Sequence, residues 1–217
     1  MTQHMQREME KLKKMILALS AVVEESVQQA AQSLEKMDVE LAEKVIGNDN
    51  QVDEMEVDLE EECLKILALY QPVAIDLRFI ISVLKINNDL ERIADLAVNI
   101  AERTLALSDE TRIPAPFDFS EMARKVETML EKSLDALVNM DSRLALQVCG
   151  LDDEVDAIHK QTYQLVKDQI RRHSERMDQL VHYLSVSRHL ERIADLATNI
   201  AEDVMYMIQG EIVRHTI

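Results

Sequence analysis

Hydrophobic residues recur along almost the whole chain at alternating spacings of three and four, the pattern of an amphipathic α-helix. One such seam runs through Ile86, Leu90, Ile93, Ala97 and Ile100. A seam of this kind faces a core and leaves the intervening polar residues on the opposite side. Only three glycines and three prolines occur in 217 residues, so the predicted helices are few and long. The sequence therefore predicts an all-α protein.

The periodic segments divide into six predicted helices, three in each half of the chain. Asp38 and Asp141 precede the second helix of each half, where a short acceptor side chain satisfies a free backbone N–H group. Pro72 ends the second helix of the first half. We expect helices over residues 5–36, 39–70 and 74–107, and again over 118–139, 142–174 and 177–209.

The two halves are copies of one unit. Residues 90–102 read LERIADLAVNIAE and residues 190–202 read LERIADLATNIAE, so only Val98 and Thr198 differ. Self-similarity at a fixed period indicates a repeated structural unit. The sequence therefore predicts two tandem three-helix bundles, related by a pseudo-twofold repeat, in a six-helix molecule.

The boundary between the copies is predicted from the only stretch that resembles a linker. Pro114 and Pro116 lie in it, and proline interrupts helices because it lacks the backbone N–H group. We expect the first repeat over residues 1–107, the linker over 108–117 and the second repeat over 118–217.

The third helix of each repeat carries a polar stripe opposite its hydrophobic seam. A face that only contacts water needs polarity alone, so two diverged copies could exchange its residues freely. The stripe of the first copy comprises Asn88, Glu91, Asp95, Asn99 and Glu102, and although Asp89 beside it has become His189, its last four residues recur unchanged. A solvated face remains an alternative, but the repetition favours a functional surface. The repeated residues are Glu91, Asp95, Asn99 and Glu102 in the first copy and Glu191, Asp195, Asn199 and Glu202 in the second.

The second helix supplies a partner stripe, whose members project within about 60° of one another and have apolar neighbours. Carboxylates in such surroundings are costly unless they are paired, hydrogen-bonded or coordinated. We expect the opposite side of this helix, with Glu54, Asp58, Glu61 and Glu62, to face solvent. The stripe comprises Asp49, Asp53, Glu56 and Glu60 in the first copy and Asp152, Asp156, His159 and Tyr163 in the second.

Acidic residues four positions apart on a helix lie about 6 Å from each other. They can hold hard cations when a second helix supplies another pair. We expect Arg92 and Arg192 to neutralise neighbouring carboxylates, while His159 is either a ligand or an ordinary interhelical histidine. The candidate metal ligands are Asp49, Asp53, Glu91, Asp95, Asp152, Asp156, Glu191 and Asp195, with Asn99, Glu102, His159, Asn199 and Glu202 as additional candidates.

Charge and cysteine content limit the partners. With 41 acidic against 24 basic residues the net charge is −17, which repels nucleic acid and anionic bilayers but leaves a basic membrane protein as a partner. Cys63 and Cys149 fall within helical apolar patterns, as small hydrophobic residues do. With neither a leader-like apolar run nor a membrane-length one, we expect a reduced, cytoplasmic protein.

In these features the sequence resembles the PhoU family, on the third-helix pattern LERIADLAxNIAE and the acid-x-x-x-Asp motifs of both repeats. The resemblance implies a cytoplasmic, commonly dimeric regulator of phosphate transport and phosphate homeostasis. It implies bound metal ions. These are iron or zinc, either as single ions or as multinuclear clusters, with magnesium or manganese as alternatives. It further implies two partners at the inner membrane: the ATPase subunit of the phosphate ABC transporter and the phosphate-sensing histidine kinase. Members act as adaptors and negative regulators, not as enzymes.

Two other functions compete with this hypothesis. A di-metal carboxylate enzyme needs a Glu-x-x-His motif on two helices of a bundle, and the sequence contains none. The similar Asp156-x-x-His159 occurs in one copy only. A helical adaptor without metal, whose acidic stripe contacts a basic partner, remains open on the sequence alone.

Overall fold

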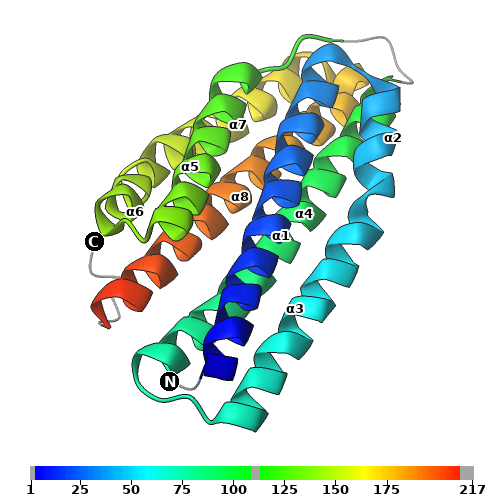
Figure 1. Ribbon diagram of the computed structural model, residues 1–217. Helices are drawn as coiled ribbons and strands as arrows, with labels where there is room; N and C mark the ends of the chain where they lie inside the picture. Colours follow the sequence, from blue (N-terminus) through cyan, green and yellow to red (C-terminus); the bar gives the residue numbers. More distant parts are fainter. Residues whose placement is uncertain (1–2, 109–112, 211–217) are drawn as a thin grey trace.

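The computed structural model describes residues 3–108 and 113–210, which form helices and no strand. Residues 109–112 of the predicted linker lie outside the described residues. Figure 1 shows the helices of the two repeats packed along one another, and the described residues are almost entirely helical, so the predicted all-α class is confirmed. The first repeat contains α1 (Gln3–Lys36), α2 (Val39–Gly47), α3 (Asp49–Tyr70) and α4 (Ile75–Ser108); the second contains α5 (Phe119–Asn139), α6 (Ser142–Cys149), α7 (Asp152–Arg172), the 3₁₀ turn η1 (Ser174–Arg176) and α8 (Met177–Gln209).

The second helix of each repeat is broken near its start, so the prediction of one continuous helix was wrong there. The break is a tight turn: the N–H group of Gln51 donates to the carbonyl of Asn48 at 3.0 Å, a three-residue spacing. In the second repeat Glu154 bonds to the carbonyl of Leu151 in the same way, at 3.2 Å. Glycine immediately precedes both turns, and glycine weakens a helix interior. The break places the first acid of each stripe in the opening turn of α3 or α7.

Both repeats enter the broken helix through the same corner. Met37 and Met140 adopt the left-handed conformation, with φ of 54° and 50°. The aspartate that follows each of them accepts a hydrogen bond from the backbone at the start of the next helix, as the sequence predicted. Asp38 accepts from Leu41 at 3.0 Å, and Asp141 accepts from Arg143 at 2.8 Å.

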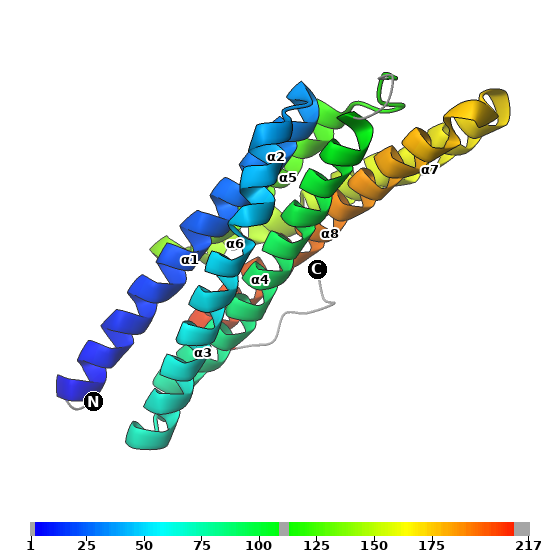
Figure 2. The same cartoon turned by 90° about the vertical axis from the view of Figure 1, so that its right-hand side faces the viewer.

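The helices α4 and α8 form the centre of the molecule. They form the most extensive helix pair and run antiparallel, while α1 and α5 lie side by side in front of them in Figure 1. Figure 2 shows α2 and α3 following one flank of α4 and α7 following α8. Both central helices carry buried alanines at matching positions, 94, 97 and 101 of α4 and 194, 197 and 201 of α8.

The antiparallel register of the central pair is fixed by a contact between the repeats. Lys85 on α4 places its Nζ 3.1 Å from the carboxylate of Asp203 on α8 and 5.4 Å from the ring centre of Tyr206. Asp203 is only 2% exposed. The repeats therefore share one hydrophobic core that crosses the α4–α8 contact.

Glu62 on α3 is buried, which corrects the prediction that it faces solvent. It is 6% exposed and accepts hydrogen bonds from Lys11 of α1 and from Lys65, the latter at 3.0 Å. Burial alone raises the pKa of Glu62, but these lysines outweigh burial and lower the pKa to about 2. The carboxylate thus joins the first and third helices of the chain.

Replacing Glu62 with glutamine should lower the free energy of unfolding at pH 7 by about 2 kcal/mol. A carboxyl group whose folded pKa is depressed stabilises the fold above its unfolded pKa, and that contribution is lost as the pH falls through the folded pKa. The deficit of Glu62→Gln should therefore shrink between about pH 4.5 and pH 2, as measured by urea unfolding. Glu61→Gln, at the exposed neighbouring position, is the control, and an equal deficit in both variants would contradict the assignment.

Candidate functional site

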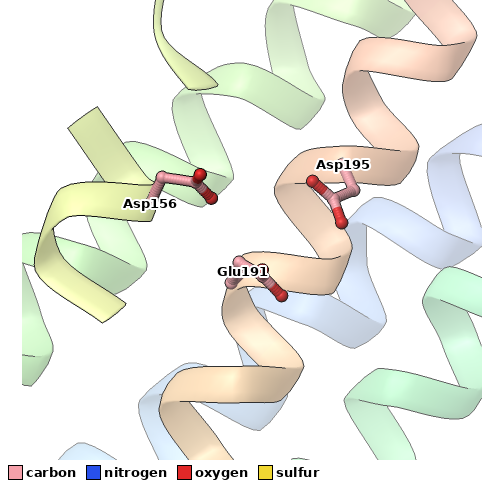
Figure 3. Close-up of side chains that lie close together, drawn as sticks. All are labelled: Asp156, Glu191 and Asp195. Atoms are coloured by element: carbon pink, nitrogen blue, oxygen red, sulfur yellow. The ribbon is translucent and has the colours of Figure 1, made fainter. Parts of the chain in front are cut away.

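Carboxylates of α7 and α8 converge in the second repeat. Asp156, Glu191 and Asp195 can each present one oxygen such that these atoms lie within 4.8 Å of one another. Figure 3 shows Asp156 extending from α7 toward α8, where Glu191 and Asp195 occupy successive turns. Two of the three are partly buried, and Asp195 is exposed. We call these three residues, together with Asp152, the second-repeat acid cluster.

The acids of this cluster repel one another. Burial, and then the negative charges of Asp195 and Asp156, raise the pKa of Asp152 to about 6. Partial desolvation by the packed helices, followed by Glu191 and Asp156, likewise raises the pKa of Asp195 to about 6, against the opposing effect of Arg192. The pKa of Glu191 is also raised, first by burial and then by Asp156. Such a cluster favours any cation, whether a proton or a metal ion.

The first repeat repeats the arrangement with Asp49 and Asp53 of α3 and Glu91 and Asp95 of α4, the first-repeat acid cluster. Burial, followed by Asp53 and Asp95, raises the pKa of Asp49. Burial, followed by Asp95, Glu56 and Asp53, raises the pKa of Glu91. The electrostatic coupling therefore matches that of the second repeat. Among the described residues, however, only the second repeat brings three ligand atoms within 4.8 Å of one another.

The structure also locates the additional candidates. The Asn99 amide donates to the backbone of Asp95 at 2.7 Å, and Glu102 pairs with Arg103 at 3.1 Å. Asn199 lines a hollow beside α4, and the negative charge of Glu202 acts on Cys149.

His159 lies between helices rather than among the three converging acids. Its Nδ1 is 3.0 Å from the hydroxyl of Ser187 on α8, and burial lowers its pKa. In the matching place of the first repeat, Glu56 accepts a hydrogen bond from the buried Asn87 at 3.2 Å. These contacts favour the interpretation of His159 as an interhelical histidine.

The two arginines differ in their contacts. Arg92 lies 3.8 Å from Asp89, and its charge partly offsets the effects that raise the pKa of Glu91. In the second repeat His189 stands in the place of Asp89, and the charge of Arg192 only partly offsets the effects that raise the pKa of Asp195. The arginines therefore act on the acid clusters through their charge at longer range, and not through a direct ion pair.

Cys149, at the end of α6, was not assigned to the site from the sequence. Burial, and then the charges of Glu202 and Asp152, raise the pKa of its thiol, so the sulfur lies beside the second-repeat acid cluster. The sequence did contain a signal: Cys149 lies three residues before Asp152, whereas the equivalent residue of the first repeat, three before Asp49, is Ile46.

The fold and its two acid clusters define a helical tandem-repeat protein with an acidic surface in each repeat. The PhoU domain family matches residues 16–104 and 119–204, which together cover most of the chain. The chain belongs to the PhoU family. Within the described residues, no helix is long and apolar enough to cross a membrane.

Individual relatives are similar over nearly their whole length. The phosphate-specific transport system accessory protein PhoU homolog of Aquifex aeolicus is 38% identical, covering 96% of this chain and 95% of that protein. The homolog of Pseudomonas aeruginosa is 36% identical, over 99% of this chain and 89% of that protein.

Solved structures carry the same fold. The crystal structure of PhoU from Pseudomonas aeruginosa superposes with a TM-score of 0.91 at 35% identity, covering 95% of this chain and 99% of that one. The phosphate transport system regulatory protein PhoU from Streptococcus pneumoniae gives 0.85 at 29% identity, covering 96% and 99%.

Proposed function

We propose that this protein is a cytoplasmic regulator of phosphate uptake and of the phosphate-starvation response, and that it acts by binding rather than by catalysis. Its partners are the ATPase subunit of the phosphate ABC transporter and the phosphate-sensing histidine kinase, and it works as a homodimer. Family membership supports the transport role, because the curated relatives are named accessory proteins of the phosphate-specific transport system.

The observation that carries the binding part of this proposal is the presence of an acid cluster at matching positions of both repeats. Each cluster joins two helices, and burial and mutual repulsion raise the pKa values of its acids. Carboxylate oxygens suit hard cations such as Mn²⁺ and Mg²⁺, and an all-oxygen set is a less typical site for zinc. The acid clusters would hold a metal ion and thereby fix the spacing of α3 and α4, and of α7 and α8.

A metal-free adaptor is the second candidate, supported by the net charge of −17. The cytoplasmic loops of membrane proteins carry an excess of lysine and arginine, so an acidic surface fits a basic one there. Metal analysis of freshly isolated protein separates the two candidates, since only the first requires bound ions.

Deletion of the gene tests the regulatory role. Phosphate uptake and expression of phosphate-starvation genes should both rise in phosphate-rich medium and return to normal when the wild-type chain is restored. The tagged chain should also retain the transporter ATPase from solubilised membranes. Unchanged uptake and expression in the deletion strain would show that the proposed role is wrong.

A further inference from the structure

A polar groove runs between α1 and α5, the two helices that lie side by side in front of the central pair in Figure 1. It encloses about 680 Å³ between the second half of α1 and the first half of α5. At one end of this groove the hydroxyl of Ser120 on α5 donates to Glu35 of α1 at 2.7 Å, so the two helices are joined there. The lining includes Glu25, Gln32 and Glu35 of α1 and Ser120, Arg124 and Glu127 of α5.

Carboxylates continue along the α1–α5 groove and beyond it. Glu127, Glu131 and Asp135 follow one another at intervals of four residues, so they share one face of α5. Burial, and then the charges of Glu131 and Asp135, raise the pKa of Glu24 on α1. Burial, and then the charge of Glu35, likewise raise the pKa of Glu127. Acids of both helices therefore lie along one contact and repel one another.

The lysines of α5 are directed away from this contact. Lys125 donates to Glu154 of α7, and the amine of Lys132 lies 3.4 Å from the side-chain oxygen of Gln147 on α6. Arg124 does line the groove, but its single charge leaves the acids of α1 and α5 in excess. The groove is therefore negatively charged and open to a cationic partner.

The acids at the middle of this contact occupy matching positions in the two repeats. Glu24 and Glu127 are 103 positions apart, the same separation as the corner residues Met37 and Met140 that follow their helices. Both glutamates are partly buried. A face that only contacts water needs polarity but no carboxylate at the same place in both copies, so the repetition favours a charged partner.

An apolar pocket of about 120 Å³ lies at the other end of the α1–α5 contact. Val138 and Met140 at this pocket are 54% and 45% exposed, so the pocket is open to solvent. It has room for an aliphatic side chain. The apolar residues that line it are Ile16 and Leu17 of α1, Phe79 of α4, and Leu137, Val138 and Met140 at the end of α5.

We propose that the α1–α5 groove binds a helix of a partner protein that carries lysine or arginine along one face and an aliphatic side chain near one end. A helix can lay one face into a groove between two others, with its cations against the acids and its aliphatic side chain in the apolar pocket. A second copy of the groove would instead bring acids against acids. The proposal rests on the proposed function in that the regulator has a protein partner, but it needs no metal ion and uses neither acid cluster.

Calorimetric titration of the full chain with a synthetic helical peptide, which has lysines on one face and a leucine near one end, tests the groove. Glu127→Gln combined with Glu131→Gln should weaken binding about tenfold, because two carboxylates that pair with the peptide are lost. Glu54→Gln combined with Asp58→Asn is the matched control. It removes the same charge at the same spacing from exposed positions on α3 and should bind the peptide as the wild type does.

The apolar pocket is tested by changing one side chain on each side of the contact. Replacing the leucine of the peptide with alanine should weaken binding to the wild type about tenfold, through the loss of apolar burial. Val138→Ser should weaken binding of the leucine peptide about threefold and leave binding of the alanine peptide unchanged. Val57→Ser, at a similarly exposed position on α3, should change neither. Circular dichroism verifies that each variant is folded.

Three results would overturn the proposal. Equal weakening by the groove pair and the control pair would mean that the peptide follows the overall charge of −17. No binding up to about 1 mM peptide would mean that the groove accepts no such helix. Light scattering that shows a changed oligomeric state for Glu127→Gln, Glu131→Gln, with unchanged peptide binding, would assign the groove to a second copy of the chain. Retention of the transporter ATPase tests the proposed function separately, so either can fail without the other.

Discussion

Replacing Lys85 with methionine should lower the free energy of unfolding by about 3 kcal/mol, the effect of breaking an ion pair that has one buried member. The carboxylate of Asp203 is 2% exposed and receives the lysine at 3.1 Å from the other repeat. Methionine keeps most of the aliphatic packing of Lys85 but removes its charge. Guanidinium unfolding followed by helical circular dichroism measures the change.

A double-mutant cycle separates the ion pair from simple packing. Lys85→Met combined with Asp203→Leu should recover most of the loss, because no buried charge remains. Lys13→Met is the control: Lys13 also lies over a ring, that of Phe79 at 5.8 Å, but its ion pair with Glu10 is exposed and worth little. A loss in the control as large as that of Lys85→Met would mean that Asp203 does not depend on this lysine.

The helices could be predicted from the sequence because their signals are local. Apolar spacing located the six segments, and Asp38 and Asp141 capped the predicted helices as expected. The break at Asn48 was missed because periodicity continues through one tight turn, and Gly47 alone is a weak signal in a helical pattern.

The shared core could not be predicted from periodicity in the same way. Helix α4 is buried by α1, by α2 and α3, and by α8, so buried residues surround most of its circumference. A hydrophobic seam shows that one side of a helix is covered, but it does not show that another side of the same helix meets a second repeat. That contact joins residues about 100 positions apart, and only the folded chain reveals it.

The positions of the acid clusters could be predicted because the two copies of the repeat can be compared residue by residue within one chain, which composition alone does not allow. Identical acids in diverged copies indicated a constraint, and the structure brings the two second-repeat stripes together. The burial of Glu62 was not predictable in the same way, because its partner Lys11 reaches it from another helix. Whether a charge is solvated is decided by the partner helix, which a single helical pattern does not identify.

Replacing Glu191 with glutamine and Asp195 with asparagine should remove the second repeat's share of bound metal and leave helicity intact, since both changes preserve side-chain shape. One cation at a hundredfold excess over its Kd stabilises the wild-type fold by about 2.7 kcal/mol. For a chain of this length that raises Tm by about 5 to 10 °C, and the variant should lose this increment at its second repeat. Elemental analysis and thermal unfolding with and without Mn²⁺ measure both effects.

The pH dependence of this binding follows from the raised pKa values of Asp152 and Asp195, about 6 in the fold against an ordinary 3.8. An acid with a raised folded pKa stabilises the metal-free protein at low pH, and this contribution is lost as the pH rises through 6. Protons and metal ions compete for the second-repeat acid cluster, so bound metal should be released as the pH falls below 6. At pH 8, without metal, the Glu191→Gln, Asp195→Asn variant should be more stable than the wild type, because it lacks the repulsion between these acids.

The matched pair Glu91→Gln with Asp95→Asn should remove the first repeat's share instead. The exposed pair Glu54→Gln with Asp58→Asn, also four residues apart on α3, should change nothing. Because all three double variants remove the same charge, they separate a site from the general attraction of an acidic protein for cations. Equal metal losses in all three would mean that the ions are only a diffuse atmosphere, and the two acid clusters would then be surfaces for a basic partner.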